Sequence, residues 1–80
     1  MTAKRMFEKL GYELTTDDQY CKLYNRVNDK YSINISFEKQ DKAFVKFYYE
    51  EGGYLRDYTE IIDMKEFKAI QKELKELGWL

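Results

Sequence analysis

Two pairs of adjacent carboxylates and one thiol are the side chains of this chain that most resemble catalytic groups: Asp17-Asp18, Glu50-Glu51 and Cys21. A glycosidase-type pair needs two carboxyl groups that face each other across a cleft, about 5–9 Å apart. The side chains of adjacent residues usually diverge, and both pairs are expected in exposed loops. Cys21 falls on the apolar side of an expected strand, which is typical of a small buried hydrophobic residue rather than a nucleophile.

Other catalytic and cofactor-binding motifs are missing from the sequence. It contains no histidine, which removes the commonest general base and the usual zinc ligand, and a lone cysteine cannot form a thiolate metal site. Its only adjacent glycines, Gly52-Gly53, lie where a hairpin turn is expected and match no phosphate-binding loop. The sequence therefore predicts a protein that is not an enzyme and that holds no metal ion or cofactor.

Aromatic and basic residues alternate along the expected strands and could bind a partner. If two helices cover one face of a sheet, these side chains are expected to share the open face. Rings interleaved with Lys and Arg resemble a stacking platform for single-stranded nucleic acid. Tyrosine and arginine are also favoured at protein–protein contacts, and tyrosine is an ordinary strand residue that tolerates partial exposure. The candidate partner-binding face comprises Tyr20, Lys22, Tyr24, Arg26, Phe44, Lys46, Tyr48 and Arg56.

The charge balance weighs against nucleic acid as the main partner. Lys and Arg number 14 and Asp and Glu number 15, a formal net charge of -1, whereas binders of nucleic acid and anionic membranes rely on clustered cations. Lysines and glutamates alternate near the C-terminus, and such mixed charge is typical of a solvated helix face with weak ion pairs. These residues are Lys65, Lys68, Lys72 and Lys75, with Glu66, Glu73 and Glu76.

Four segments are expected to form the strands that position these side chains. Residues 31–38 give the clearest signal, because odd-numbered apolar residues alternate with even-numbered polar ones. Residues 20–27 and 43–49 also alternate, and their odd-numbered apolar side chains are expected to face the core. Residues 54–61 are expected to form the fourth strand, with faces that the sequence does not separate, and residues 15–18 a polar turn.

A short helix is expected at the start of the chain. Thr2 is a suitable N-cap, and Gly11 stands where a left-handed residue commonly ends a helix. The aromatic Tyr12 that follows the glycine is expected to fold back onto the helix end. The apolar stripe of this helix comprises Ala3, Met6, Phe7 and Leu10.

A longer helix is expected at the end of the chain. Asp63 and Glu66 have the spacing of a capping box, and Gly78 followed by Trp79 repeats the ending of the first helix. The expected apolar stripe comprises Met64, Phe67, Ile70, Leu74 and Leu77. Short turns join the elements, so we expect one α+β domain over residues 1–80: a four-stranded antiparallel meander with both terminal helices on one face, in the order α-β-β-β-β-α.

The two ends of the chain resemble a group of small uncharacterised proteins encoded by phages and prophages of low-GC Gram-positive bacteria. The resemblance rests on the opening MTAKRMFEKLGY and the closing IQKELKELGWL. It implies a bacterial, cytoplasmic setting with a mobile-element history and carries over no catalytic residue. The single cysteine, and the lack of an apolar run of signal-peptide or membrane-span length, also favour the cytoplasm.

These observations predict a non-enzymatic phage- or prophage-type accessory protein that binds another protein through the open face of its sheet. Single-stranded nucleic acid on the same aromatic and basic face is the alternative. No membrane partner is expected, and the protein is expected to be a monomer or a homodimer.

Overall fold

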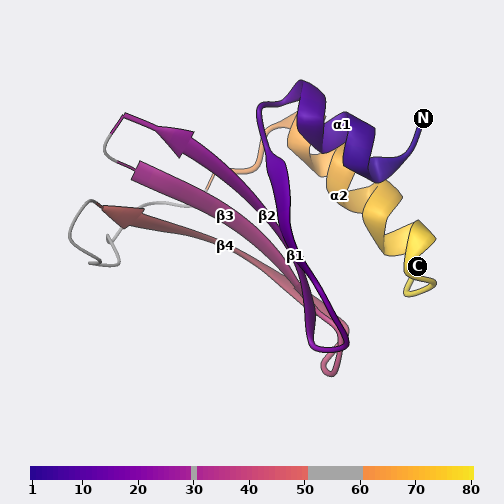
Figure 1. The fold of residues 1–80 in the computed structure, drawn as a ribbon. Helices are drawn as coiled ribbons and strands as arrows, with labels where there is room; N and C mark the ends of the chain where they lie inside the picture. Colours follow the sequence, from indigo (N-terminus) through magenta and orange to yellow (C-terminus); the bar gives the residue numbers. More distant parts are fainter. Residues whose placement is uncertain (30, 51–60) are drawn as a thin grey trace.

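The computed structural model describes residues 1–29, 31–50 and 61–80 of the chain. The elements follow the order helix, four strands, helix (Figure 1), which confirms the predicted α+β architecture. Their bounds are α1 Ala3–Lys9, β1 Glu13–Asp17, β2 Cys21–Asn28, β3 Tyr31–Glu38, β4 Ala43–Glu50 and α2 Met64–Glu76.

The strands form one antiparallel meander in the order β1-β2-β3-β4. Across the inner strands the register is continuous: Tyr24 lies opposite Ile35, and Ile35 lies opposite Lys46. Because directly opposed residues share a face of a sheet, this register places these three side chains together. The regular alternation of β3 therefore determines which side chains of β2 and β4 point toward the core.

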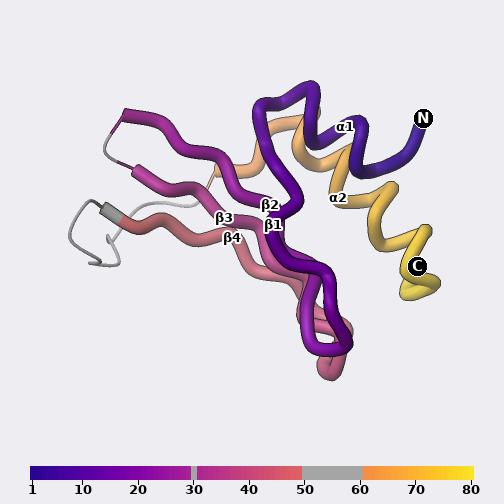
Figure 2. The backbone as a smooth tube through the Cα atoms, viewed as in Figure 1, coloured from indigo at the N-terminus to yellow at the C-terminus, as the bar shows by residue number. Residues whose placement is uncertain are grey.

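Both helices pack on one face of this sheet, as the ribbon and the backbone tube show (Figures 1 and 2). Phe7 of α1 stacks on Tyr24 of β2 with ring centroids 4.1 Å apart. Glu73 of α2 accepts a hydrogen bond from the hydroxyl of the same tyrosine. The helices also contact each other, since the backbone N–H of Ala3 donates to the Glu76 carboxylate at 2.9 Å.

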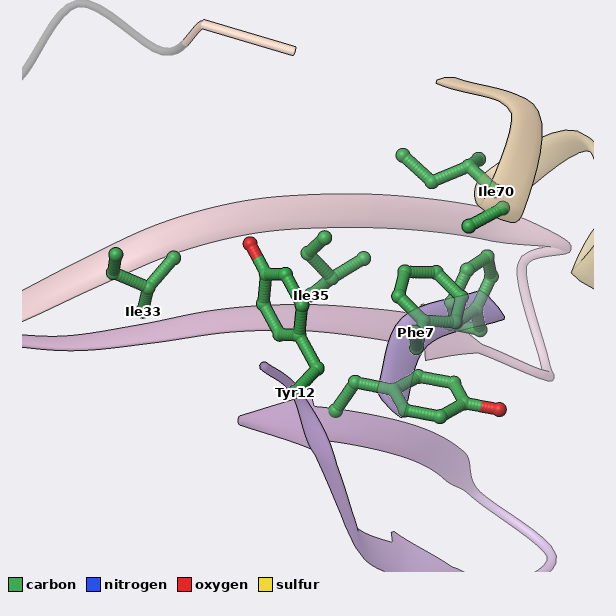
Figure 3. Packing of buried hydrophobic residues seen from close by; sticks show 8 residues of the cluster. Phe7, Tyr12, Ile33, Ile35 and Ile70 are labelled. Atoms are coloured by element: carbon green, nitrogen blue, oxygen red, sulfur yellow. The ribbon is translucent and has the colours of Figure 1, made fainter. Parts of the chain in front are cut away.

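The core lies between the helix pair and the sheet and is built mainly from rings and β-branched side chains (Figure 3). Phe7 is its centre, with Tyr12 edge-on at 5.7 Å and Phe37 edge-on at 6.1 Å between ring centroids. Such aromatic pairs contribute about 0.5–1.5 kcal/mol each beyond the burial of their area. The buried hydrophobic cluster comprises Phe7, Tyr12, Tyr24, Ile33, Ile35, Phe37, Ala69 and Ile70.

The helix ends adopt the predicted N-caps and glycine stops, but the Glu66 side chain bonds to Tyr12 and Lys46 rather than completing the predicted capping box. The side chain of Thr2 accepts from the Arg5 N–H, and that of Asp63 accepts from the Glu66 N–H at 2.8 Å. Gly11 has φ of 91° and Gly78 of 79°, a region that L side chains rarely adopt. The residue after each glycine bonds back to its helix, through Tyr12 N–H to Phe7 O and Trp79 N–H to Leu74 O.

The identity of the strands differs from the prediction. Residues 13–17 form the edge strand β1, whereas the polar run 15–18 was expected to turn. Edge strands tolerate polar residues, and here Leu14 alone packs against the core while a bulge follows it. The expected strand 54–61 lies outside the described residues except for Ile61, which is not in a strand.

The buried face of α2 also differs from the predicted stripe. Met64 and Phe67 are 67 % and 49 % exposed, whereas Glu66 and Glu73 are 4 % and 0 % exposed. The glutamates face inward because α2 contacts both α1 and the sheet. Glu76 accepts from the Ala3 N–H, Glu73 accepts from Tyr24 of β2, and Glu66 accepts from Lys46 of β4. Prediction of the helix was therefore correct, and prediction of its inner face was correct for Ile70, Leu74 and Leu77 but wrong for Met64 and Phe67.

Candidate protein-binding surface

The aromatic and basic face predicted to be open is the face that the helices cover. Tyr24 is fully buried, Lys46 is 4 % exposed, and Lys22 is half-buried against α2. The predicted inner and outer faces of β2 and β4 are therefore reversed. Apolar residues alternate with tyrosines and lysines along these strands, and both sets of side chains carry large hydrophobic surfaces, so alternation alone does not identify the inner face. A stacking platform for single-stranded nucleic acid cannot operate on these buried side chains.

Three of the remaining members, Arg26, Phe44 and Tyr48, lie on the same covered face, opposite the buried Ile33 and Phe37 of β3. The Arg26 guanidinium lies over the Tyr12 ring at 4.7 Å and donates to the Leu10 carbonyl at 3.0 Å. Tyr48 packs against the core, and Phe44 is 39 % exposed with its ring 5.9 Å from that of Phe37. Tyr20 is 66 % exposed in the turn between β1 and β2, away from this face, and Arg56 lies outside the described residues.

One buried carboxylate of α2 joins β2 to the helix layer. Glu73 lies 3.0 Å from the Lys22 ammonium and accepts the hydroxyl hydrogen bond of Tyr24. A buried charge is tolerated only when it is paired and hydrogen-bonded, and here one carboxylate meets both requirements. The lysine and tyrosine of β2 can therefore face inward.

A second buried carboxylate repeats the arrangement on β4. Glu66 lies 2.8 Å from the Lys46 ammonium and accepts from the Tyr12 hydroxyl at 3.1 Å. Lys46 also donates to the backbone carbonyl of Ile61 at 2.6 Å, which ties the start of α2 to the sheet. Because the two glutamates are seven residues apart, they lie on one side of the helix, two turns apart.

Burial, and then these carboxylates, raise the pKa of two phenols. Burial raises the pKa of Tyr12 and of Tyr24 well above the ordinary value of 10.0, and the neighbouring Glu66 or Glu73 raises it further. A phenol that donates to a carboxylate resists ionisation because a second negative charge would face the first. The tyrosines are therefore structural donors at physiological pH.

The inward turn of the glutamates leaves lysine on the solvent side of α2. Lys65, Lys68 and Lys75 are exposed and Lys72 is half-buried, whereas Glu76 bonds to the α1 backbone. The lysines of α2 are therefore separated from Glu66 and Glu73, whereas the sequence predicted a solvated face on which lysines and glutamates form weak ion pairs. The cations on the solvent side of the two helices are together called the basic helix surface, in which Lys9, Lys65 and Lys68 meet at one pocket and Lys4 pairs with Glu8: Lys4, Arg5, Lys9, Lys65, Lys68, Lys72 and Lys75.

An apolar pocket of about 220 Å³ opens within this surface, between α1 and α2. Met6 and Leu10 belong to the α1 segment and pack on their inner side against the core. Lys9 and Lys65 approach from the facing ends of the two helices, and their alkyl stems supply further apolar wall. The lining residues are Met1, Met6, Lys9, Leu10, Lys65 and Lys68.

Of the candidate catalytic groups, Asp17, Asp18 and Cys21 have structural surroundings, whereas the Glu50 side chain and Glu51 lie outside the described part of the chain. The Asp18 carboxylate accepts from the backbone N–H groups of Cys21 and Tyr20, which lowers its pKa, and Asp17 pairs with Lys39 at 3.1 Å. Partial burial raises the pKa of the Cys21 thiol and disfavours the reactive thiolate. Among the described residues no cluster of three or more metal-ligating side chains occurs.

The opposite face of the sheet carries apolar side chains around a polar centre. Val27, Val45 and Tyr49 are 73 %, 41 % and 39 % exposed. Between them the Asn25 amide donates to the Ser32 hydroxyl at 2.6 Å and to the Asn34 carbonyl at 3.0 Å. The polar centre is thus internally hydrogen-bonded.

Sequence reasoning missed the basic helix surface and its pocket. The positions of Glu66 and Glu73 around α2 were one available signal. Both lie on the same side of the helix as Ile70, whose burial was predicted, so their inward orientation could have been inferred. The contribution of α1 to the pocket gave no such signal, since Met6 and Leu10 belong to a stripe expected to be wholly internal.

Comparisons of the chain with protein-family models, with curated proteins and with solved structures gave no match. Neither of the described helices is long and apolar enough to cross a membrane. Inferences about function therefore rest on the geometry of the described residues.

Proposed function

We propose that this protein is a non-enzymatic module that binds another protein, and that the basic helix surface is its contact for an acidic partner. The observation that carries the proposal is the separation of charge on α2, with lysines outward and Glu66 and Glu73 inward. A surface in which one sign of charge predominates steers an oppositely charged partner and increases its rate of association.

The apolar groups beside these cations favour a protein partner over a nucleic acid. Met1 is 69 % exposed at the pocket, and Phe67 is 49 % exposed on α2. Protein interfaces combine an apolar centre with a polar rim, whereas contacts to nucleic-acid backbones are dominated by cations and hydrogen-bond donors. The overall charge of -1 adds no general attraction for polyanions.

The test is capture of partners from cells that express the protein, followed by titration of each purified partner. Replacement of Lys65 and Lys68 together by Glu is expected to weaken binding of an acidic partner by more than about tenfold at low salt. The control is Lys42→Glu, which alters an exposed lysine in the β3–β4 turn. Capture of no specific partner, or equal affinity for the charge-reversed and control variants, contradicts the proposal.

A further inference from the structure

We infer that the pocket between α1 and α2 receives one large apolar side chain of an acidic segment in the partner protein. This inference deepens the proposed function and rests on it, because it names the chemistry that the basic helix surface recognises.

The size of the pocket favours a side chain over a free small molecule. Its volume of about 220 Å³ is below the range of about 300–1,000 Å³ typical of small-molecule sites. A pocket of this size suits an anchor such as Leu, Phe or Met, the kind of residue that dominates the energy of many interfaces.

The walls of the pocket are apolar and adaptable. Met1, Met6 and Leu10 are the apolar residues of the lining, and methionine side chains adjust to partners of different shape because they are unbranched and polarisable. Leu10 is the C-cap of α1, and its carbonyl is held by Arg26, so this wall has a firm backbone.

The rim of the pocket selects charge. In the part of the chain that the structure describes, Lys9, Lys65 and Lys68 form no ion pair, and all three are exposed. The nearby glutamates of α2 are committed to Lys22 and Lys46 from the sheet. Carboxylates that flank an apolar anchor would therefore meet cations that have no internal competitor.

The three methionines of the chain provide a direct test. Met1 and Met6 line the pocket and Met64 does not, so methyl-labelled methionine reports on the site without any substitution. The probe is a synthetic peptide of about 15 residues in which a central Phe is flanked by Glu and Asp, a length sufficient for an amphipathic turn or helix. The control peptide has Ser in place of the Phe and carries the same charge.

The anchored peptide is expected to shift the Met1 and Met6 methyl signals, to leave Met64 unchanged, and to bind at least about tenfold more tightly than the Ser peptide. Met6→Ala is expected to reduce this preference, whereas Met64→Ala, the same truncation outside the pocket, is not. Thermal melting of both variants separates loss of the pocket from loss of the fold.

Equal affinity for the two peptides overturns the inference, as does binding that leaves the Met1 and Met6 signals in place. Tighter binding of an oligothymidylate, or of phosphatidylserine-containing vesicles, in the same titrations also overturns it. If both peptides bind equally and the Lys65→Glu/Lys68→Glu variant binds neither, the pocket inference fails while the proposed function stands. If capture from cells yields no partner, the proposed function itself fails.

Discussion

On β2 and β4, the two faces of the sheet carry residues opposite to those that simple alternation suggests, whereas β3 follows its alternation. The covered face includes Lys22, Tyr24 and Lys46. The opposite face, which we call the open face because neither described helix packs on it, includes Val27 and Val45, which are 73 % and 41 % exposed. Whether a strand side chain is buried in this small domain therefore depends on the hydrogen-bond and ion-pair partners that the helices offer, as well as on its own hydrophobicity.

The energetic reason lies in the helix that covers the sheet. An unpaired buried ammonium costs several kcal/mol, but each inward lysine has a buried carboxylate of α2 within 3.0 Å. The rings of Tyr12 and Tyr24 then enter the core while their hydroxyl groups donate to the same carboxylates. Large aromatic side chains bury more apolar area than valine, so this arrangement stabilises the covered face.

Removal of one inner carboxylate should cause the largest loss of stability on the covered face. Glu73→Ala leaves the Lys22 ammonium and the Tyr24 hydroxyl without their partner, and we expect the free energy of unfolding to fall by about 3–5 kcal/mol. Urea denaturation measures the change. Glu8→Ala is the matched control, because Glu8 belongs to an exposed pair with Lys4 at 3.7 Å and its loss should cost less than about 1 kcal/mol. Similar losses for both variants would contradict the role of the buried pair.

Alkaline pH should lower the free energy of unfolding through the tyrosines of the covered face. Because the pKa values of Tyr12 and Tyr24 are raised in the folded state, the unfolded chain releases these protons first as pH rises above about 10. The two phenols therefore make their full contribution to the free energy of unfolding below pH 10. This contribution falls above pH 10, by about 3 kcal/mol at pH 11 for the two phenols together. Urea denaturation at several pH values checks this, and a Tyr12→Phe/Tyr24→Phe variant should lose stability less steeply across that range.

Loss of a single inner hydroxyl should have a smaller effect. Tyr24→Phe retains the ring stacked on Phe7 but removes the donor to Glu73, and we expect a cost of about 1.5–3 kcal/mol at neutral pH. Tyr20→Phe removes a hydroxyl from a side chain that is 66 % exposed and should be nearly neutral. Chemical denaturation of both variants sharpens the comparison, and equal costs would refute it.

The smallest effect is expected on the open face. Val27→Thr changes an exposed side chain and should alter the free energy of unfolding by less than about 0.5 kcal/mol. Ile35→Val removes one methylene group from a fully buried position on the covered face and should cost about 0.5–1.5 kcal/mol. A larger loss for Val27 than for Ile35 in thermal or urea melts would mean that the open face also supports the fold.

The local elements were predictable where one short segment contains the whole signal. Thr2, Asp63, Gly11 and Gly78 define the helix ends through bonds and backbone angles that span only a few residues. β3 was also predictable, since its odd-numbered residues 33, 35 and 37 are apolar and buried. The short edge strand β1 was missed because its polar sequence resembles a turn, and only pairing with β2 makes it a strand.

The candidate site was less predictable than the fold. The lysines of α2 were identified, but their isolation from Glu66 and Glu73 depends on ion pairs to residues 20 or more positions distant in the chain. The pocket requires residues from both ends of the chain. No local pattern encodes either feature.

The sequence by itself determined the order of helices and strands, the caps of the helices and the orientation of β3, because propensity and periodicity act between near neighbours. The tertiary structure decided which sides of β2, β4 and α2 face inward, and thereby which charges reach solvent. Cross-strand register and helix-to-sheet ion pairs join distant residues, so their effect exists only once the chain has folded.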